Sequence, residues 1–86
     1  MPDITFTEKA FAEYLSWQQD KPTMKRINAL IKDIMRTPFE GIGKPEPLKY
    51  GEANRWSRRI NGADRLVYRV VDGAIIVLQC KGHYDE

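Results

Sequence analysis

The pattern of apolar positions in the first half of the chain predicts two helices. The first is expected to begin at Glu8, because Thr7 can cap its first turn, and to end near Asp20. The second is expected to run from Lys21 to Arg36, where a following Thr-Pro pair stops it. Its apolar side chains recur at three- and four-residue steps, at Met24, Ile27, Leu30, Ile31, Ile34 and Met35. The short link between the two segments predicts an antiparallel helical hairpin.

Four segments are predicted to be strands: residues 3–7, 56–60, 65–71 and 74–81. Asn61-Gly62 and Asp72-Gly73 mark the turns between the later segments. Residues 37–50 hold three prolines and two glycines and predict a loop. Within this loop, the prolines on both sides of Glu46 restrict the backbone that carries its carboxylate.

The Asp72-Gly73 turn also predicts which residues of the last two strands face each other. As a two-residue hairpin loop it pairs residues whose numbers sum to 145, so Arg65 is expected opposite Cys80 and near the tail Gly82-His83-Tyr84. Both faces of this hairpin carry apolar side chains. One face holds Leu66, Tyr68, Val70, Ile75 and Val77, and the other holds Val67, Ile76, Leu78 and Cys80 beside Arg65 and Arg69. Which face meets the helices is left open by this pattern.

Composition narrows the class of protein. The length of 86 residues predicts one domain spanning residues 1–86, and 42% hydrophobic with 30% charged residues is typical of a soluble globular chain. No apolar run approaches the roughly 20 residues of a transmembrane helix. The N-terminus lacks the basic flank and apolar core of a signal peptide, and the single cysteine, Cys80, excludes an internal disulfide. These features predict a cytoplasmic protein with no membrane association.

The net charge of +2 is unevenly distributed along the chain. Residues 1–43 hold six Lys/Arg and six Asp/Glu, residues 44–81 hold eight against four, and residues 82–86 hold two acids. A local positive field of this kind suits a phosphate backbone. On charge alone, the solvated surface of a basic sheet explains the pattern equally well.

The same basic region contains groups suited to cutting RNA without a metal. A general base takes a proton from a 2'-hydroxyl, a general acid gives one to the leaving oxygen, and cations hold the phosphate as its charge rises. Glu46, the only histidine His83 and the phenol of Tyr84 are candidates for this chemistry. The candidate cations are Lys49, Arg58, Arg59 and Arg65. One histidine and one cysteine form a poor ligand set for a metal, so no metal or other cofactor is predicted.

Several short motifs follow one another along the chain in a specific order. They are Arg36-Thr37-Pro38-Phe39-Glu40-Gly41, Gly43-Lys44-Pro45-Glu46-Pro47-Leu48-Lys49, Trp56-Ser57-Arg58-Arg59-Ile60, Arg65-Leu66-Val67-Tyr68, and Cys80 with His83-Tyr84. With these motifs the chain resembles, over nearly its whole length, the YoeB/Txe family of bacterial toxins within the RelE-like superfamily.

This resemblance implies a toxin of a toxin–antitoxin pair, an endoribonuclease that cuts messenger RNA in the A site of the bacterial ribosome and inhibits translation. It implies an α+β fold in which an N-terminal strand and an antiparallel helical hairpin pack on a twisted antiparallel sheet. It also implies a homodimer that a cognate antitoxin of the YefM/Axe type holds inactive. Operator DNA is expected to be bound only through the toxin–antitoxin complex.

The family's active-site pattern implies a role for each matching position. Glu46 is expected to be the general base toward the 2'-hydroxyl, and His83 the general acid for the 5'-oxygen. Arg65 is expected to stabilise the phosphate, and Tyr84 to orient the phosphate or stack on a base. Two further cations are expected to contact the RNA: Lys49 and Arg59. The expected products are a 2',3'-cyclic phosphate, which can open to a 3'-phosphate, and a 5'-hydroxyl.

Neighbouring arginines on one strand cannot all serve the same site. Arg58 and Arg59 are expected on opposite faces, and the family pattern favours Arg59, which leaves Arg58 to general RNA attraction or to a surface charge. For Arg65, an alternative is an ordinary ion pair with Asp64 or Asp72, worth about 0–1 kcal/mol if exposed.

The chain departs from the family at its end, where Asp85 and Glu86 follow the His-Tyr pair that usually closes the chain. Two acids beside the site are expected to weaken its attraction for RNA, because they oppose the positive field of the basic region. Two rival functions are a gyrase inhibitor like the ParE relatives and an RNA-binding module without turnover. The ParE relatives lack the set of Glu46, Arg65 and the His83-Tyr84 tail, which argues against the first rival.

Overall fold

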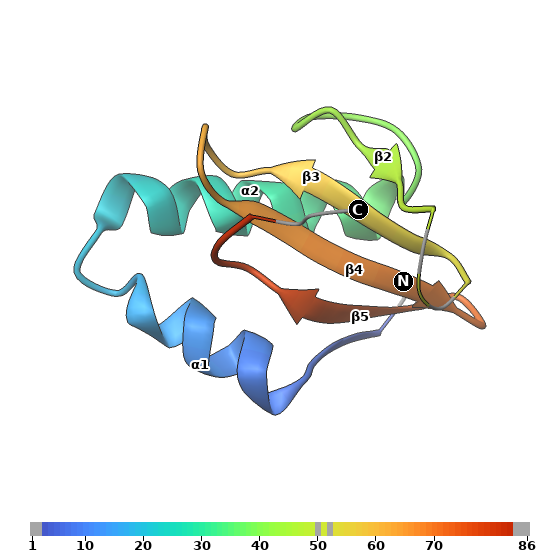
Figure 1. Cartoon of the computed structure of the whole chain (residues 1–86), viewed down its shortest axis with the longest axis horizontal. Helices are drawn as coiled ribbons and strands as arrows, with labels where there is room; N and C mark the ends of the chain where they lie inside the picture. Colours follow the sequence, from blue (N-terminus) through green and yellow to red (C-terminus); the bar gives the residue numbers. More distant parts are fainter. Residues whose placement is uncertain (1–2, 50, 52, 84–86) are drawn as a thin grey trace.

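Two helices and five strands make up the structure, a computed structural model that describes residues 3–49, 51 and 53–83. Strand β1 (Ile4–Phe6) leads into helices α1 (Glu8–Ser16) and α2 (Lys21–Arg36), which run in roughly opposite directions (Figure 1). Four strands follow: β2 (Glu46–Pro47), β3 (Arg55–Arg59), β4 (Arg65–Val71) and β5 (Ala74–Gln79). The α+β class and the helical hairpin predicted from the sequence are confirmed.

Side-chain caps set the helix starts where the sequence predicted them. The Thr7 hydroxyl accepts a hydrogen bond from the backbone N–H of Ala10 at 3.1 Å, and Asp20 accepts one from Thr23 at 3.1 Å. Helix α1 ends at Ser16, earlier than the predicted end near Asp20. Because Asp20 is the N-cap of α2, the residues before it leave the helical conformation to form the connecting turn.

The strands form one sheet in the order β1-β5-β4-β3-β2. The pairs β2–β3, β3–β4 and β4–β5 are antiparallel, as in the predicted antiparallel sheet, whereas β1 runs parallel to β5 and makes the sheet mixed. No tight turn joins β1 to β5, so nothing local imposes an antiparallel direction on this pair. The predicted loop also contains the short strand β2, which lies at the sheet edge next to β3 (Figure 1).

The hairpin of β4 and β5 follows the predicted register only near its turn. Pairs from Val71–Ala74 to Tyr68–Val77 match the prediction, but a bulge then places Val67 opposite Gln79. The predicted pairing of Arg65 with Cys80 is therefore wrong by one residue. The bulge also moves Cys80 into the core, away from the face on which the alternation placed it.

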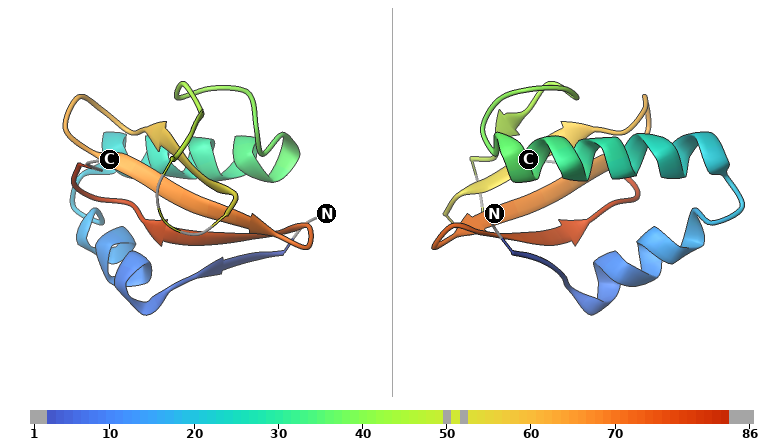
Figure 2. Two further views of the ribbon diagram at one scale, coloured as in Figure 1. Left: turned by 45° about the vertical axis from the view of Figure 1, so that its right-hand side comes forward. Right: turned by 180° about the vertical axis from the view of Figure 1, so that it is seen from behind.

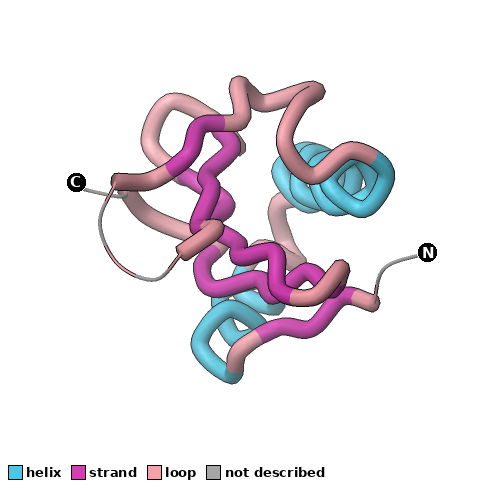
Figure 3. The backbone as a smooth tube through the Cα atoms, turned by 90° about the vertical axis from the view of Figure 1, so that its right-hand side faces the viewer, coloured by secondary structure: helices cyan, strands magenta, loops and turns pink. Residues whose placement is uncertain are grey.

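Helix α2 covers one face of the sheet and α1 lies beside the β1–β5 edge (Figures 2 and 3). The buried side chains of α2 pack against one face of the central strands to form the core: Ile27, Leu30, Ile34, Leu66, Tyr68, Ile75 and Val77. Of the two possible faces of the hairpin, the one with Leu66 and Tyr68 therefore meets the helix. Neither helix in the described part of the chain is long and apolar enough to cross a bilayer.

Candidate functional site

The face of the sheet that points away from α2 carries three of the predicted site residues. Arg58 points into the interior toward α2, so its neighbours on β3, Ser57 and Arg59, point to the other face. Residues directly opposite on antiparallel strands share a face, and the pairs are Glu46 with Ser57 and Arg59 with Arg65. We call this surface, with Glu46, Ser57, Arg59 and Arg65, the distal face.

Backbone and side-chain hydrogen bonds hold the segment before His83 against this face. The N–H of Gly82 donates to Oδ1 of Asp64 at 2.7 Å, and the N–H of Arg65 donates to the carbonyl of Gly82 at 2.9 Å. Nε2 of Gln79 donates to the carbonyls of Gly82 at 3.1 Å and of His83 at 3.2 Å. Gly82, which precedes the exposed His83, is thus held beside Arg65. The predicted proximity of Arg65 and the tail is confirmed.

The guanidinium of Arg65 is oriented by carbonyl groups. Its Nη1 donates to the carbonyl oxygens of Asn61 at 2.9 Å and Asp64 at 3.2 Å. The carboxylate of Asp64 instead accepts the Gly82 N–H, and no ion pair joins Arg65 to an acid among the described residues. Carbonyl dipoles position the cation without neutralising it, which leaves its charge available for a phosphate.

Arg58 does not belong to this surface, and its predicted role in attracting RNA is wrong. Its side chain is fully buried and donates to Oδ2 of Asp33 at 2.6 Å and to the hydroxyl of Tyr68 at 3.2 Å. It also donates to backbone carbonyls of the loop after α2, at Thr37, Glu40 and Ile42. A buried guanidinium bonded to this many acceptors has a structural role. Its removal would leave the Asp33 carboxylate and several backbone carbonyls without a partner, which is strongly destabilising in a buried site.

Two groups bonded to Arg58, the carboxyl of Asp33 and the hydroxyl of Tyr68, have shifted pKa values. The hydrogen bond from Arg58, with help from the Ile42 N–H, lowers the pKa of Asp33 to about 2. Burial raises the pKa of Tyr68 above its usual value of 10.0, against the opposing effect of Arg58. Tyr68 therefore keeps its hydroxyl proton and donates it to the carbonyl of Pro38 at 2.6 Å.

The loop after α2 wraps around Arg58 and leads to Glu46. Gly41 and Gly43 have φ angles of +126° and +80°, and a side chain on Gly41 would collide with the Asp33 carboxylate. The carbonyl of Gly43 accepts the N–H of Arg59 at 2.7 Å, which attaches the loop to the end of β3. The loop then enters β2, where Glu46 is exposed.

The structure thus brings together Glu46, Arg59 and Arg65 on one face, with His83 following a segment held next to Arg65. Lys49 is exposed beyond the end of β2 and is not placed with them by a strand pairing. Tyr84, Asp85 and Glu86 lie outside the described residues. Within the described ranges, no three histidine, cysteine or acidic side chains are grouped as a metal site requires.

A family model described as the YoeB-like toxin of a bacterial type II toxin–antitoxin system matches residues 6–84. The chain belongs to this YoeB-like toxin family. It is 54% identical to Toxin YoeB of Synechocystis sp. over 82 residues, which cover 94% of this chain and 95% of that one.

Solved structures agree with this assignment. The YoeB/ParE toxin from Agrobacterium tumefaciens superposes with a TM-score of 0.90 at 45% identity, covering 95% of this chain and 99% of that one. The YoeB dimer of Staphylococcus aureus gives a TM-score of 0.88 at 49% identity, covering 96% and 98%. The YoeB–YefM complex of the same organism gives 0.86 at 48%, covering 98% and 99%. This YoeB-like chain is therefore a toxin of a type II toxin–antitoxin system.

Three residues that organise the site of this YoeB-like toxin were not predicted from its sequence. They are Asn61, Asp64 and Gln79. The Asn61-Gly62 turn signal marks the location of the first two, since Asn and Asp side chains commonly bind turn amides. Gln79 carries no signal in a single sequence, because its bonds depend on how the tail turns back across β5.

Helix α1 fixes the end of β5 just before the tail. The indole Nε1 of Trp17 donates to the carbonyl of Cys80 at 2.9 Å, and the N–H of Cys80 donates to Oε1 of Glu13 at 2.9 Å. The buried thiol donates to the carbonyl of Ala10 at 3.3 Å. Burial, reinforced by Glu13, raises the pKa of Cys80 to about 12, so the thiol is a packed core group and not a nucleophile.

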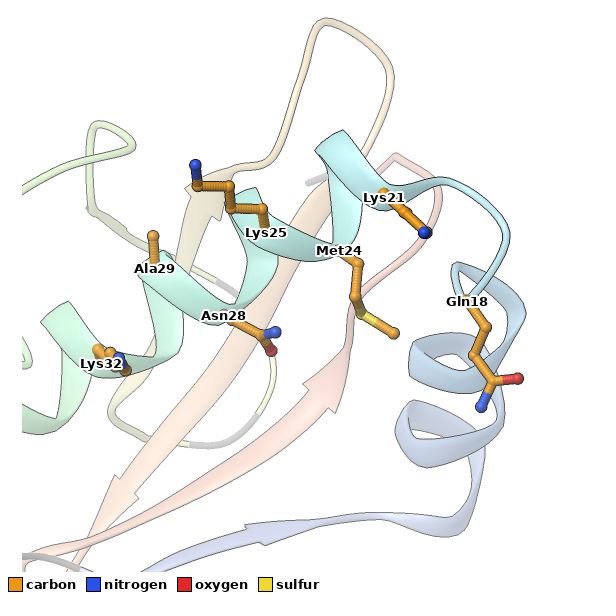
Figure 4. Close-up of a pocket in the computed structure, with 7 residues that line it drawn as sticks. All are labelled: Gln18, Lys21, Met24, Lys25, Asn28, Ala29 and Lys32. Atoms are coloured by element: carbon orange, nitrogen blue, oxygen red, sulfur yellow. The ribbon is translucent and has the colours of Figure 1, made fainter.

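A hollow of about 480 Å³ lies between the end of α1 and the outer surface of α2 (Figure 4). Its lining combines three lysines with two amides, a methionine and an alanine: Gln18, Lys21, Met24, Lys25, Asn28, Ala29 and Lys32. None of the predicted site residues contributes to it. Because α2 covers the opposite face of the sheet, this hollow is separate from the distal face.

Proposed function

We propose that this YoeB-like toxin is a ribosome-dependent endoribonuclease that cuts messenger RNA in the A site and so inhibits translation. Membership of the family supports the proposal. The observation that carries it is the distal face, where Glu46, Arg59 and Arg65 share one surface and the backbone before His83 is held against Arg65. A carboxylate, fixed cations and an imidazole are the groups that this chemistry needs.

The proposed reaction is an attack of the 2'-oxygen on the adjacent phosphorus. Glu46 takes the 2'-hydroxyl proton as the 2'-oxygen bonds to phosphorus, and His83 gives a proton to the 5'-oxygen as its bond to phosphorus breaks. The products are a 2',3'-cyclic phosphate, which water can open to a 3'-phosphate, and a 5'-hydroxyl. No oxidant, reductant or metal takes part in this balance.

The cations act on the phosphate, whose negative charge rises in the transition state. Arg65 is placed to contact it, since carbonyl groups orient its guanidinium and the tail lies alongside. Arg59 is directly opposite Arg65 on β3 and supplies a second cation on the same face. In this proposal Lys49 contacts the RNA backbone, and Tyr84 orients the phosphate or stacks on a base.

The proposed partners follow from the relatives. The Staphylococcus aureus YoeB forms a dimer and a complex with YefM, so we propose a homodimer and a YefM-like antitoxin for this chain. Contact with operator DNA is proposed only through that complex. The proposed place of action is the cytoplasm, where the ribosomes are.

The direct test is primer extension on a defined messenger RNA, with and without bacterial ribosomes, after addition of the purified toxin. A discrete cut within the A-site codon, seen only when ribosomes are present, is expected. No cut in either condition, from folded protein free of antitoxin, contradicts the proposal and favours gyrase inhibition or plain RNA binding.

The variant His83→Ala tests the catalytic role within the same assay. Loss of a general acid is expected to lower the single-turnover cleavage rate by roughly 10²-fold or more. Binding to ribosomes, measured by co-sedimentation, is expected to stay within about twofold of the original, because one exposed side chain contributes little to a large interface. A fall in rate of less than about threefold removes His83 from the mechanism.

A further inference from the structure

The turn between β3 and β4 forms hydrogen bonds both with Arg65 and with the residue that precedes His83. The carbonyl groups of Asn61 and Asp64 hold the guanidinium of Arg65, and the carboxylate of Asp64 holds the N–H of Gly82 at 2.7 Å. The N–H of Arg65 returns a bond to the carbonyl of Gly82 at 2.9 Å. Asp64 at the end of the turn and Arg65 at the start of β4 therefore bind the N–H and the carbonyl of Gly82, the residue before His83.

We propose that Asp64 is a positioning residue for catalysis, which sets the distance between Arg65 and His83 by holding Gly82. This inference rests on the proposed nuclease function and deepens it. Asp64 does not touch the RNA in this scheme. It acts through Gly82, because the imidazole of His83 can only be as well placed as the backbone that leads to it.

The turn is rigid enough for this role. Oδ1 of Asn61 accepts the N–H groups of Ala63 and Asp64, both at 2.8 Å, and the carbonyl of Asp64 accepts the N–H of Ile60 at 3.0 Å. These bonds lie within the turn itself and fix the backbone of Asp64 independently of the tail. Its carboxylate is consequently presented in one orientation, and a charged acceptor at this distance makes a strong hydrogen bond.

The other contacts of the tail leave Asp64 a distinct part to play. Glu13 and Trp17 bind Cys80, two residues before Gly82, and secure the end of β5 to α1. Gln79 binds carbonyl oxygens of the tail and leaves the N–H of Gly82 to Asp64. Gly82 has a φ of +90°, at which the chain changes direction toward His83. Without the Asp64 bond, the tail would stay attached but lose its fixed direction at this bend.

The experiment compares Asp64→Ala with Asp64→Asn. Both remove the same negative charge, but only asparagine keeps an oxygen that can accept the Gly82 N–H. Any effect of charge on RNA attraction is therefore common to the two variants, and their difference reports the hydrogen bond. Asp3→Ala serves as the matched control for loss of an acid, since Asp3 is exposed and far along the chain from the turn.

The single-turnover rate of cleavage is measured on ribosomes programmed with messenger RNA, over a range of toxin concentrations. Asp64→Ala is expected to lower the saturating rate by roughly 10- to 100-fold, the scale of a misplaced catalytic group, with the half-saturating concentration within about twofold. Asp64→Asn and Asp3→Ala are expected to stay within about threefold of the original rate. Equal rates for the alanine and asparagine variants overturn the proposal.

Hydrogen exchange of the Gly82 amide, followed by NMR, gives a readout that does not depend on cleavage. The Gly82 amide is expected to exchange faster in Asp64→Ala than in Asp64→Asn, while the amides of β4 and β5 keep their protection from exchange. Unchanged protection in the alanine variant also overturns the proposal. If the original toxin cleaves nothing, the nuclease function itself has failed, and the exchange data then show separately whether Asp64 holds the tail.

Discussion

Arg58 uses all three guanidinium nitrogens inside the protein. Nε donates to the Tyr68 hydroxyl, Nη1 to Asp33 and the Ile42 carbonyl, and Nη2 to the carbonyls of Thr37 and Glu40. Arg59, one residue later on β3, is exposed on the distal face. Two neighbouring arginines thus differ completely in environment, and strand alternation is the cause.

This contrast predicts different responses to the same substitution. Arg58→Lys keeps a positive charge near Asp33 but cannot reach all these acceptors, so we expect a loss of about 2–3 kcal/mol in the free energy of unfolding. Arg59→Lys is the matched control and is expected to stay within about 0.5 kcal/mol. Urea denaturation followed by tryptophan fluorescence measures both. Equal stability of the two variants would contradict the structural role of Arg58.

The low pKa of Asp33 makes stability depend on acid pH. Its carboxyl titrates near 3.8 when unperturbed and at about 2 in the folded protein, so the folded state binds this proton less readily than the unfolded state. The stabilisation is fully present above about pH 4–5 and is lost as the pH falls toward 2. Allowing for partial solvent screening, we expect its loss to be worth about 1–2 kcal/mol.

Urea denaturation between pH 5 and pH 2 tests this dependence on Asp33. The side chain cannot titrate in Asp33→Asn. The free energy of unfolding of this variant is therefore expected to be lower than that of the original protein at pH 5 and to fall less steeply as the pH is lowered. An identical pH slope in the two proteins would show that other carboxyl groups govern acid unfolding.

At the scale of elements, the loop between α2 and β2 owes its path to the buried ion pair. It supplies carbonyl acceptors to Arg58, and the N–H of Ile42 donates to Oδ2 of Asp33 at 2.9 Å. Gly41 passes so close to Asp33 that no side chain fits there. The position of Glu46 at the end of this loop therefore depends on contacts on the opposite side of the sheet from the distal face.

Substitution of single glycines tests how tightly this loop is constrained. Gly41→Ala combines a φ of +126° with a collision against Asp33, and we expect a loss of about 2 kcal/mol or more in unfolding free energy. Gly62→Ala is the control, since an added Cβ there meets nothing within 4 Å. It is expected to change stability by less than about 0.5 kcal/mol. Thermal and urea denaturation of both variants provide the comparison, and a Gly41→Ala protein as stable as the control would refute it.

At the scale of the whole molecule, a small chain leaves several large apolar side chains exposed. Phe11 is 50% and Phe39 is 49% exposed, and Leu15 and Ile42 are 40% and 42% exposed. Phe39 is partly sheltered by Trp56, with the two ring centroids 5.1 Å apart. Large apolar side chains left in solvent are candidate contacts for a partner subunit.

We therefore expect the isolated toxin to be a dimer. Light scattering coupled to size-exclusion chromatography is expected to give twice the chain mass of 10.0 kDa at micromolar concentrations. Dilution is expected to shift the mass toward that of the single chain, because association follows mass action. A mass of one chain at every concentration would contradict the dimer.

Local sequence signals determined the features that depend on neighbouring residues. The Thr7 cap, Pro22 in the first turn of α2, the prolines beside Glu46 and the Asp72-Gly73 turn act within a few residues of themselves. They predicted both helix starts, strand β4 and the register near the hairpin turn, and the ordered motifs indicated the toxin family. The site candidates Glu46, Arg59, Arg65 and His83 were also chosen at this level.

Only the tertiary structure decided which side each residue faces and what holds the tail. A bulge in β5 shifted the register, placed Cys80 in the core and put Arg65 beside Gly82. The burial of Arg58 depends on Asp33, 25 positions earlier, and the anchor of Gly82 depends on Asp64, 18 positions earlier. Contacts over such separations form only when the sheet and helices pack together, so no local pattern in one sequence reveals them.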